Sequence, residues 1–166
     1  EQNLYTALCD AQEMANSQMD LNKLKLMHEF RQVLDIPLLR SVYQPIVDLS
    51  SGRPFGWEAL TRGPEGSQFQ SPGVLFDYAE EMGAIFELEK ACREQAIKGL
   101  GEMASGQKLF LNIHPRTLVD PKFSPGATLR LLNSHNLTPE NVVLEITEKH
   151  SIKDFTLFHR TLEHYR

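Results

Sequence analysis

The sequence predicts an α/β fold in which short strands alternate with helices around a largely parallel sheet. Three observations lead to this prediction. Apolar, β-rich runs recur along the chain after Pro37, stretches with helical three-and-four spacing separate them, and glycine- and proline-containing segments punctuate the pattern. At 166 residues the chain is long enough for one domain with a sizeable core.

Residues 1–40 differ in pattern from the rest and predict one long amphipathic helix, or two. No glycine occurs before Gly52, and Pro37 ends the run. Two interpretations of this segment stay open: a signalling helix that joins an upstream domain and pairs with its own copy, or a helix that packs on the following domain. The apolar positions with helical spacing are Leu4, Ala7, Leu8, Ala11, Met14, Leu24, Met27 and Leu34.

The remaining elements follow in order. Strands are predicted at 41–49, 55–62, 109–113 and 141–147, and helices within 74–103 (with an interruption near Gly83) and at 127–133 and 154–165. The first two strands form a hairpin, because the polar run Ser50-Ser51-Gly52-Arg53-Pro54 between them is typical of a turn. The acidic residues Glu80, Glu81, Glu87 and Glu89 are predicted to form a charged, solvated helix face.

Composition excludes several classes of protein. A formal net charge of −5 argues against passive binding to DNA, which needs a basic face. The two cysteines make no disulfide framework, which favours a reducing compartment. No apolar run has membrane-spanning length, so we expect a cytoplasmic segment without membrane contact.

Four short motifs are the candidates for chemistry, and each lies at or near the end of a predicted strand. Three of them contain a possible oxygen ligand: Glu58, Asn112 or Glu145. Polar residues that interrupt buried parallel strands are costly unless they are paired or ligated, and the carboxyl ends of such strands are where function is placed. The motifs are Tyr43-Gln44-Pro45-Ile46-Val47, Glu58-Ala59-Leu60-Thr61-Arg62, Leu111-Asn112-Ile113-His114-Pro115 and Val143-Leu144-Glu145-Ile146-Thr147-Glu148.

These residue types suit a divalent metal and a phosphodiester. Two carboxylates and an amide oxygen form a hard donor set that favours Mg²⁺ or Mn²⁺ over zinc. Arg62 shares a strand face with Glu58 and could hold a phosphate oxygen through its planar guanidinium. The simpler alternative is that Glu58 and Arg62 only form an ion pair.

In this order the four motifs resemble the EAL family of bacterial cyclic di-GMP phosphodiesterases. The resemblance covers residues 41–166 and implies about the first half of the family's modified (β/α)₈ barrel, with residues 1–40 as a helical linker or the end of an upstream signalling domain. It implies that Glu58, Asn112 and Glu145 hold Mg²⁺ or Mn²⁺. It also implies that Gln44, Leu60 and Arg62 line the cyclic dinucleotide site, where one phosphodiester bond is hydrolysed to give the linear dinucleotide.

The sequence departs from the family pattern in two ways. His114 stands where the family often has serine; on the same strand face as Asn112 it could touch ligand, or it could be a histidine hydrogen-bonded at a strand end. The family's acidic pair and lysine are expected beyond Arg166, so we expect this stretch alone to be inactive.

The resemblance also implies partners and leaves rival functions open. We expect a homodimer, and an upstream sensory or GGDEF domain in the parent protein. The rival functions are a non-catalytic cyclic di-GMP receptor and a structural or dimerisation module.

Overall fold

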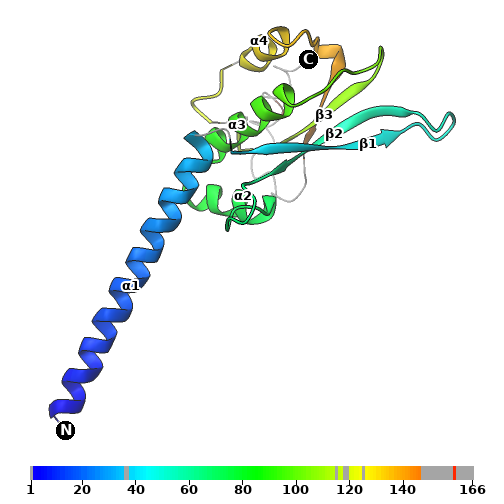
Figure 1. Ribbon diagram of the computed structural model, residues 1–166. Helices are drawn as coiled ribbons and strands as arrows, with labels where there is room; N and C mark the ends of the chain where they lie inside the picture. Colours follow the sequence, from blue (N-terminus) through cyan, green and yellow to red (C-terminus); the bar gives the residue numbers. More distant parts are fainter. Residues whose placement is uncertain are drawn as a thin grey trace.

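The computed structural model describes residues 2–35, 38–114, 116–117, 120–124, 126–146 and 159, with side chains from residue 12 onward. The predicted alternation of strands and helices is confirmed (Figure 1). The elements in chain order are α1 (Gln2–Asp35), β1 (Arg40–Val47), β2 (Pro54–Arg62), α2 (Pro72–Glu81), α3 (Ile85–Lys98), β3 (Lys108–Ile113), α4 (Ala127–Asn133), the 3₁₀ turn η2 (Pro139–Asn141) and β4 (Val142–Ile146).

The four described strands form one sheet in the order β1-β2-β3-β4. Strands β1 and β2 are an antiparallel hairpin, and β3 and β4 follow parallel to β2. The hairpin turn forms as its polar sequence predicts, because the Asp48 carboxylate accepts hydrogen bonds from the backbone N–H groups of Ser50 at 3.0 Å and Ser51 at 2.8 Å. Gly52 then supplies a backbone φ of +67°.

The interruption predicted near Gly83 is confirmed, since the helical stretch predicted within 74–103 is two helices, α2 and α3. Its outer bounds differ from the prediction, because α2 begins at Pro72 and α3 ends at Lys98. Helix α3 ends there because Gly99 and Gly101 disfavour a helical backbone. The short turn η2 was not predicted, and the helix predicted at 154–165 lies outside the described residues except for His159.

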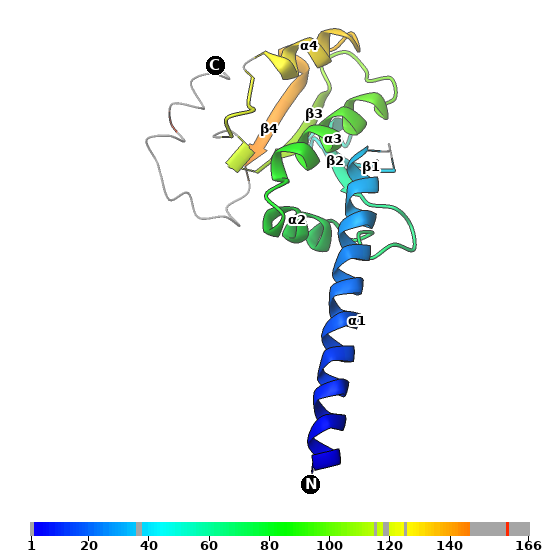
Figure 2. The same cartoon turned by 90° about the vertical axis from the view of Figure 1, so that its left-hand side faces the viewer.

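Helix α1 is a single helix of 34 residues, about 51 Å long at ~1.5 Å per residue. It projects away from the sheet and the other helices, with the N-terminus at its far end (Figures 1 and 2). Residues 12–25 are exposed, whereas Phe30 and Val33 in its last turns are buried. The carboxyl end of α1 therefore packs on the domain, whereas residues 12–25 remain exposed.

Phe30 is the anchor of that contact, since its ring lies 5.4 Å from the ring of Phe69 and 5.1 Å from that of Tyr78 between centroids. We expect Phe30→Ala to lower the free energy of unfolding by about 3 kcal/mol, because it leaves a cavity among aromatic rings. Urea unfolding of the two proteins measures this. Arg31→Ala, at the next and exposed position of the same helix, should change stability by less than about 0.5 kcal/mol.

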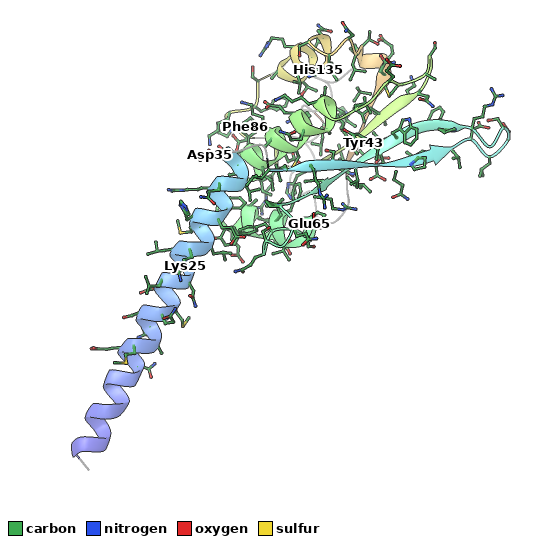
Figure 3. The ribbon with its side chains drawn as sticks, in the orientation of Figure 1. Lys25, Asp35, Tyr43, Glu65, Phe86 and His135 are labelled. Carbon is green, nitrogen blue, oxygen red and sulfur yellow. The ribbon has the colours of Figure 1, made fainter. Side chains whose placement is uncertain are left out.

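The two faces of the sheet have different partners. Leu109, Leu111 and Ala59 pack in one buried cluster with the carboxyl half of α3 and with α4. On the same face, the Tyr43 hydroxyl donates to the backbone carbonyl of Ala96 in α3 at 2.7 Å, and Figure 3 shows Tyr43 between β1 and that helix. Because side chains alternate along a strand, the residues between these positions lie on the opposite face.

Candidate functional site

The opposite face of the sheet carries the predicted oxygen ligands, and the strand register brings them together. Asn112 in β3 pairs in register with Glu145 in β4. The side-chain amide of Asn112 donates to Oε1 of Glu58 in β2 at 2.8 Å. Glu58 and Asn112 are 54 residues apart in sequence, and Asn112 and Glu145 are 33 apart. The three side chains thus meet on three neighbouring strands.

The electrostatics of this cluster favour a cation. Partial burial, together with the negative charge of Glu58, raises the pKa of Glu145. Two carboxylates that repel each other in this way are relieved by a positive charge between them. Since the amide nitrogen of Asn112 is engaged by Glu58, the atom that Asn112 can offer to a cation is its oxygen.

The donor set fits a divalent metal ion that prefers oxygen. Glu58, Asn112 and Glu145 supply carboxylate and amide oxygens from rigid strands, which suits Mg²⁺ or Mn²⁺. In the described part of the chain, no group of three or more His, Cys, Asp or Glu side chains is placed to hold a metal. The amide of Asn112 is therefore essential to any three-ligand site formed by these strands.

The three residues predicted to line the nucleotide site extend from this cluster along β1 and β2. Gln44 faces Glu58 across the hairpin in register, and it is exposed. Leu60 and Arg62 follow Glu58 at two-residue steps, so they share its face. The guanidinium of Arg62 donates to the Thr61 carbonyl at 2.8 Å. Glu58 lies four residues before the end of β2, so the strand continues past it and presents these two side chains.

His114 does not stand beside Asn112 as the alternation of a strand would require. Strand β3 ends at Ile113, and His114 is buried while Asn112 is exposed. Its Nδ1 accepts a hydrogen bond from the backbone N–H of Arg116 at 3.1 Å. This geometry agrees with a hydrogen-bonded histidine at a strand end.

The prediction of a charged, solvated face for the acidic residues of α2 and α3 was wrong in part. Glu89 is 5% exposed, and its carboxylate accepts a hydrogen bond from the backbone N–H of His114. A signal for this was present in the sequence. Ile85, Leu88, Cys92 and Ala96 form the apolar stripe of α3, and Glu89 falls within that stripe.

Burial raises the pKa of Glu89 from 4.5 to about 7, against smaller opposing effects of Thr117, the His114 N–H and Arg93. The folded state therefore holds this proton more tightly than the unfolded state. The stabilisation that this bound proton gives is complete below pH ~4.5 and is lost as the pH rises toward ~7. The loss amounts to about 3 kcal/mol, because each tenfold change in proton affinity corresponds to ~1.4 kcal/mol.

We expect the difference in unfolding free energy between wild type and Glu89→Gln to change by about 3 kcal/mol between pH 4.5 and pH 7.5, in favour of the variant at the higher pH. Urea unfolding at a series of pH values measures it. A difference that stays constant across this range would show that Glu89 ionises normally.

Comparison with known proteins gives one family. A family model described as the EAL domain matches residues 27–166. The chain is 30% identical over 146 residues to the bifunctional diguanylate cyclase/cyclic di-GMP phosphodiesterase MucR of Pseudomonas aeruginosa, covering 84% of this chain and 21% of that protein. It is 27% identical over 111 residues to the probable cyclic di-GMP phosphodiesterase PdeB of Escherichia coli, covering 64% of this chain and 21% of that protein.

A solved structure has the same fold. The EAL domain of Xanthomonas citri FimX, in complex with cyclic di-GMP, superposes with a TM-score of 0.73 at 20% identity, covering 90% of this chain and 59% of that one. The predicted fold class is thereby confirmed. The chain spans about a fifth of the length of the curated relatives it matches. Among the described residues, no helix is both long enough and apolar enough to cross a membrane.

Proposed function

The chain belongs to the EAL domain family, and from that premise we propose that it forms the metal- and nucleotide-binding part of a cyclic di-GMP phosphodiesterase. The reaction is the addition of water across one phosphodiester bond of cyclic di-GMP, which gives the linear dinucleotide. Because the chain covers only part of its relatives, hydrolysis is proposed for the whole protein and ligand binding for this chain.

One observation carries the proposal: Glu58, Asn112 and Glu145 meet on one face of the sheet although they lie far apart in sequence. Packing of the sheet does not require two carboxylates and an amide in this arrangement, and two like charges close together destabilise the fold unless a ligand relieves them. The likeness to phosphodiesterases such as MucR and PdeB is the reason for proposing cyclic di-GMP as the substrate.

The site residues have three kinds of role in this proposal. Glu58, Asn112 and Glu145 hold Mg²⁺ or Mn²⁺, which when bound polarises the phosphodiester and lowers the pKa of a bound water. Arg62 binds a phosphate oxygen through its guanidinium, and the Thr61 carbonyl restricts its orientation. Gln44 and Leu60, on the same face as Glu58, contact the nucleotide with a polar and an apolar group.

Calorimetric titration of this chain with cyclic di-GMP, with Mn²⁺ and with EDTA, tests the proposal, while chromatography follows the nucleotide in the same samples. We expect binding that depends on the metal. Absence of binding in both conditions would contradict the proposal and leave the likeness as one of fold.

The same samples separate an enzyme from a receptor. Linear dinucleotide appearing with time would show that residues 1–166 contain the groups needed for turnover. Binding that is unaffected by EDTA, without product, would indicate a non-catalytic receptor, because such a protein has no need of a metal.

The exposed part of α1 supports a further proposal about assembly. We propose that it joins the domain to an upstream sensory or GGDEF domain and pairs with the same helix of a second copy in the cytoplasm. Met14, Met19, Leu21 and Leu24 are large apolar side chains exposed along it.

A further inference from the structure

Glu89 connects helix α3 to the chain directly after β3. Its buried carboxylate accepts a hydrogen bond from the backbone N–H of His114. A carboxyl group buried in this way is costly unless its interactions compensate for the lost water. The segment that leaves the sheet at His114 is therefore held from the helix side.

That segment begins two residues after Asn112. Ile113 is buried, and Asn112 lies on the opposite face of the strand, where its amide donates to Glu58. A strand is stiff over two residues, so the position of the His114 backbone sets where the Asn112 amide lies. If this end of β3 moved by about 1 Å, the 2.8 Å bond to Glu58 would be lengthened beyond the usual range.

Two ion pairs also link the segment after β3 to helices α2 and α3. Glu80 in α2 pairs with Arg116 at 2.6 Å, and Glu87 in α3 pairs with Lys122. Both involve side chains that are partly exposed, so each contributes little on its own. Glu89 differs because it is buried and bonds to the backbone, which fixes the chain rather than a flexible side chain.

We propose that Glu89 is a positioning residue, which holds the carboxyl end of β3 so that the Asn112 amide is in place for the metal between Glu58 and Glu145. This inference rests on the proposed function, because it takes Asn112 to be a metal ligand. Glu89 touches neither the metal nor the nucleotide and acts through the backbone of His114.

The test compares Glu89→Met, which keeps the length of the side chain without an acceptor, with Glu89→Gln, which keeps the acceptor oxygen. Glu94→Met is the matched control, since Glu94 lies on the same helix and pairs with Lys98 within it. We expect the affinity for Mn²⁺ to fall about tenfold or more in Glu89→Met, and to stay within about threefold of wild type in the other two variants.

A second measurement without metal separates this inference from the proposed function. The nuclear magnetic resonance shifts of the Asn112 side-chain amide report its bond to Glu58 in the folded protein. We expect them to change in Glu89→Met and not in Glu89→Gln or Glu94→Met. A general loss of stability would not move them while the protein stays folded.

The outcomes are distinct. Wild-type affinity for Mn²⁺ and unchanged Asn112 shifts in a folded Glu89→Met protein would overturn the inference. If wild type itself binds no Mn²⁺, the metal site of the proposed function fails, and the Asn112 shifts alone decide whether Glu89 positions that residue. If Glu89→Met does not fold, Glu89→Asp takes its place, because its shorter side chain withdraws the carboxylate from His114 and should give the same changes to a smaller extent.

Discussion

Replacing Glu58 by glutamine is expected to weaken Mn²⁺ binding on the order of 100-fold or more, and to abolish the metal-dependent binding of cyclic di-GMP with it. The change removes one of the two carboxylates, on β2 and β4, that flank Asn112 on β3, and with it half of the negative charge that attracts the cation. Titration with Mn²⁺, followed by titration with the nucleotide at saturating metal, measures both effects.

The same variant should fold at least as stably as wild type in the absence of metal. Glutamine keeps an oxygen at Oε1, so the hydrogen bond from Asn112 can persist. It also removes the charge that, together with the larger effect of partial burial, raises the pKa of Glu145. If Glu58 serves binding rather than stability, the variant should lose Mn²⁺ binding and be equally or more stable to urea at pH 7.5.

Glu102→Gln is the matched control, because it makes the same change of charge at an exposed position outside the helices and strands. It should leave the affinity for Mn²⁺ unchanged. If Glu58→Gln binds Mn²⁺ as wild type does, Glu58 is not a ligand, and the cluster on this face of the sheet would be only a hydrogen-bonded group.

Replacing Gly63 by alanine is expected to lower the free energy of unfolding by about 3 kcal/mol or more. A Cβ added at this buried position would lie 1.9 Å from the carbonyl oxygen of Phe69 and 2.7 Å from its carbonyl carbon. Both are backbone atoms, so a change of rotamer cannot relieve the clash. The loop from 63 to 70 must move, and Arg62 directly precedes it.

Gly101→Ala gives the comparison, since a Cβ there has open space around it and the backbone has no positive φ. The free energies of unfolding measured in urea should differ between the two variants by about 3 kcal/mol or more, because only Gly63→Ala is expected to destabilise the fold. A weaker affinity for cyclic di-GMP in any folded fraction of Gly63→Ala would follow from displacement of Arg62. Equal stability of the two variants would show that the loop accommodates a side chain at this position.

Much of the fold could be predicted because its signals are local. The turn between β1 and β2 formed where Ser50-Ser51-Gly52 indicated it, and the helix predicted at 127–133 has those bounds. The proximity of Glu58, Asn112 and Glu145 followed from neighbouring parallel strands that place them on one face of the sheet. Their roles as ligands remain predictions.

Glu89 shows where the sequence was not sufficient. It was grouped with Glu80 and Glu87 as a solvated face, because a carboxylate on a helix is usually exposed. Its place within the apolar stripe of α3 was visible, but the partner that makes its burial tolerable is a backbone N–H 25 residues later. Helical periodicity gives no information about such a distant partner.

The sequence by itself determined the alternation of strands and helices and the family of this protein, because periodicity, turn residues and short ordered motifs are properties of neighbouring positions. Only the tertiary structure decided the other relationships: that Asn112 donates to Glu58, that His114 turns inward while Asn112 faces outward, and that α3 holds the end of β3 through Glu89. These depend on strand register and on the packing of a helix against a sheet. Both are set by contacts between residues far apart in the chain, and so cannot be read from any one segment.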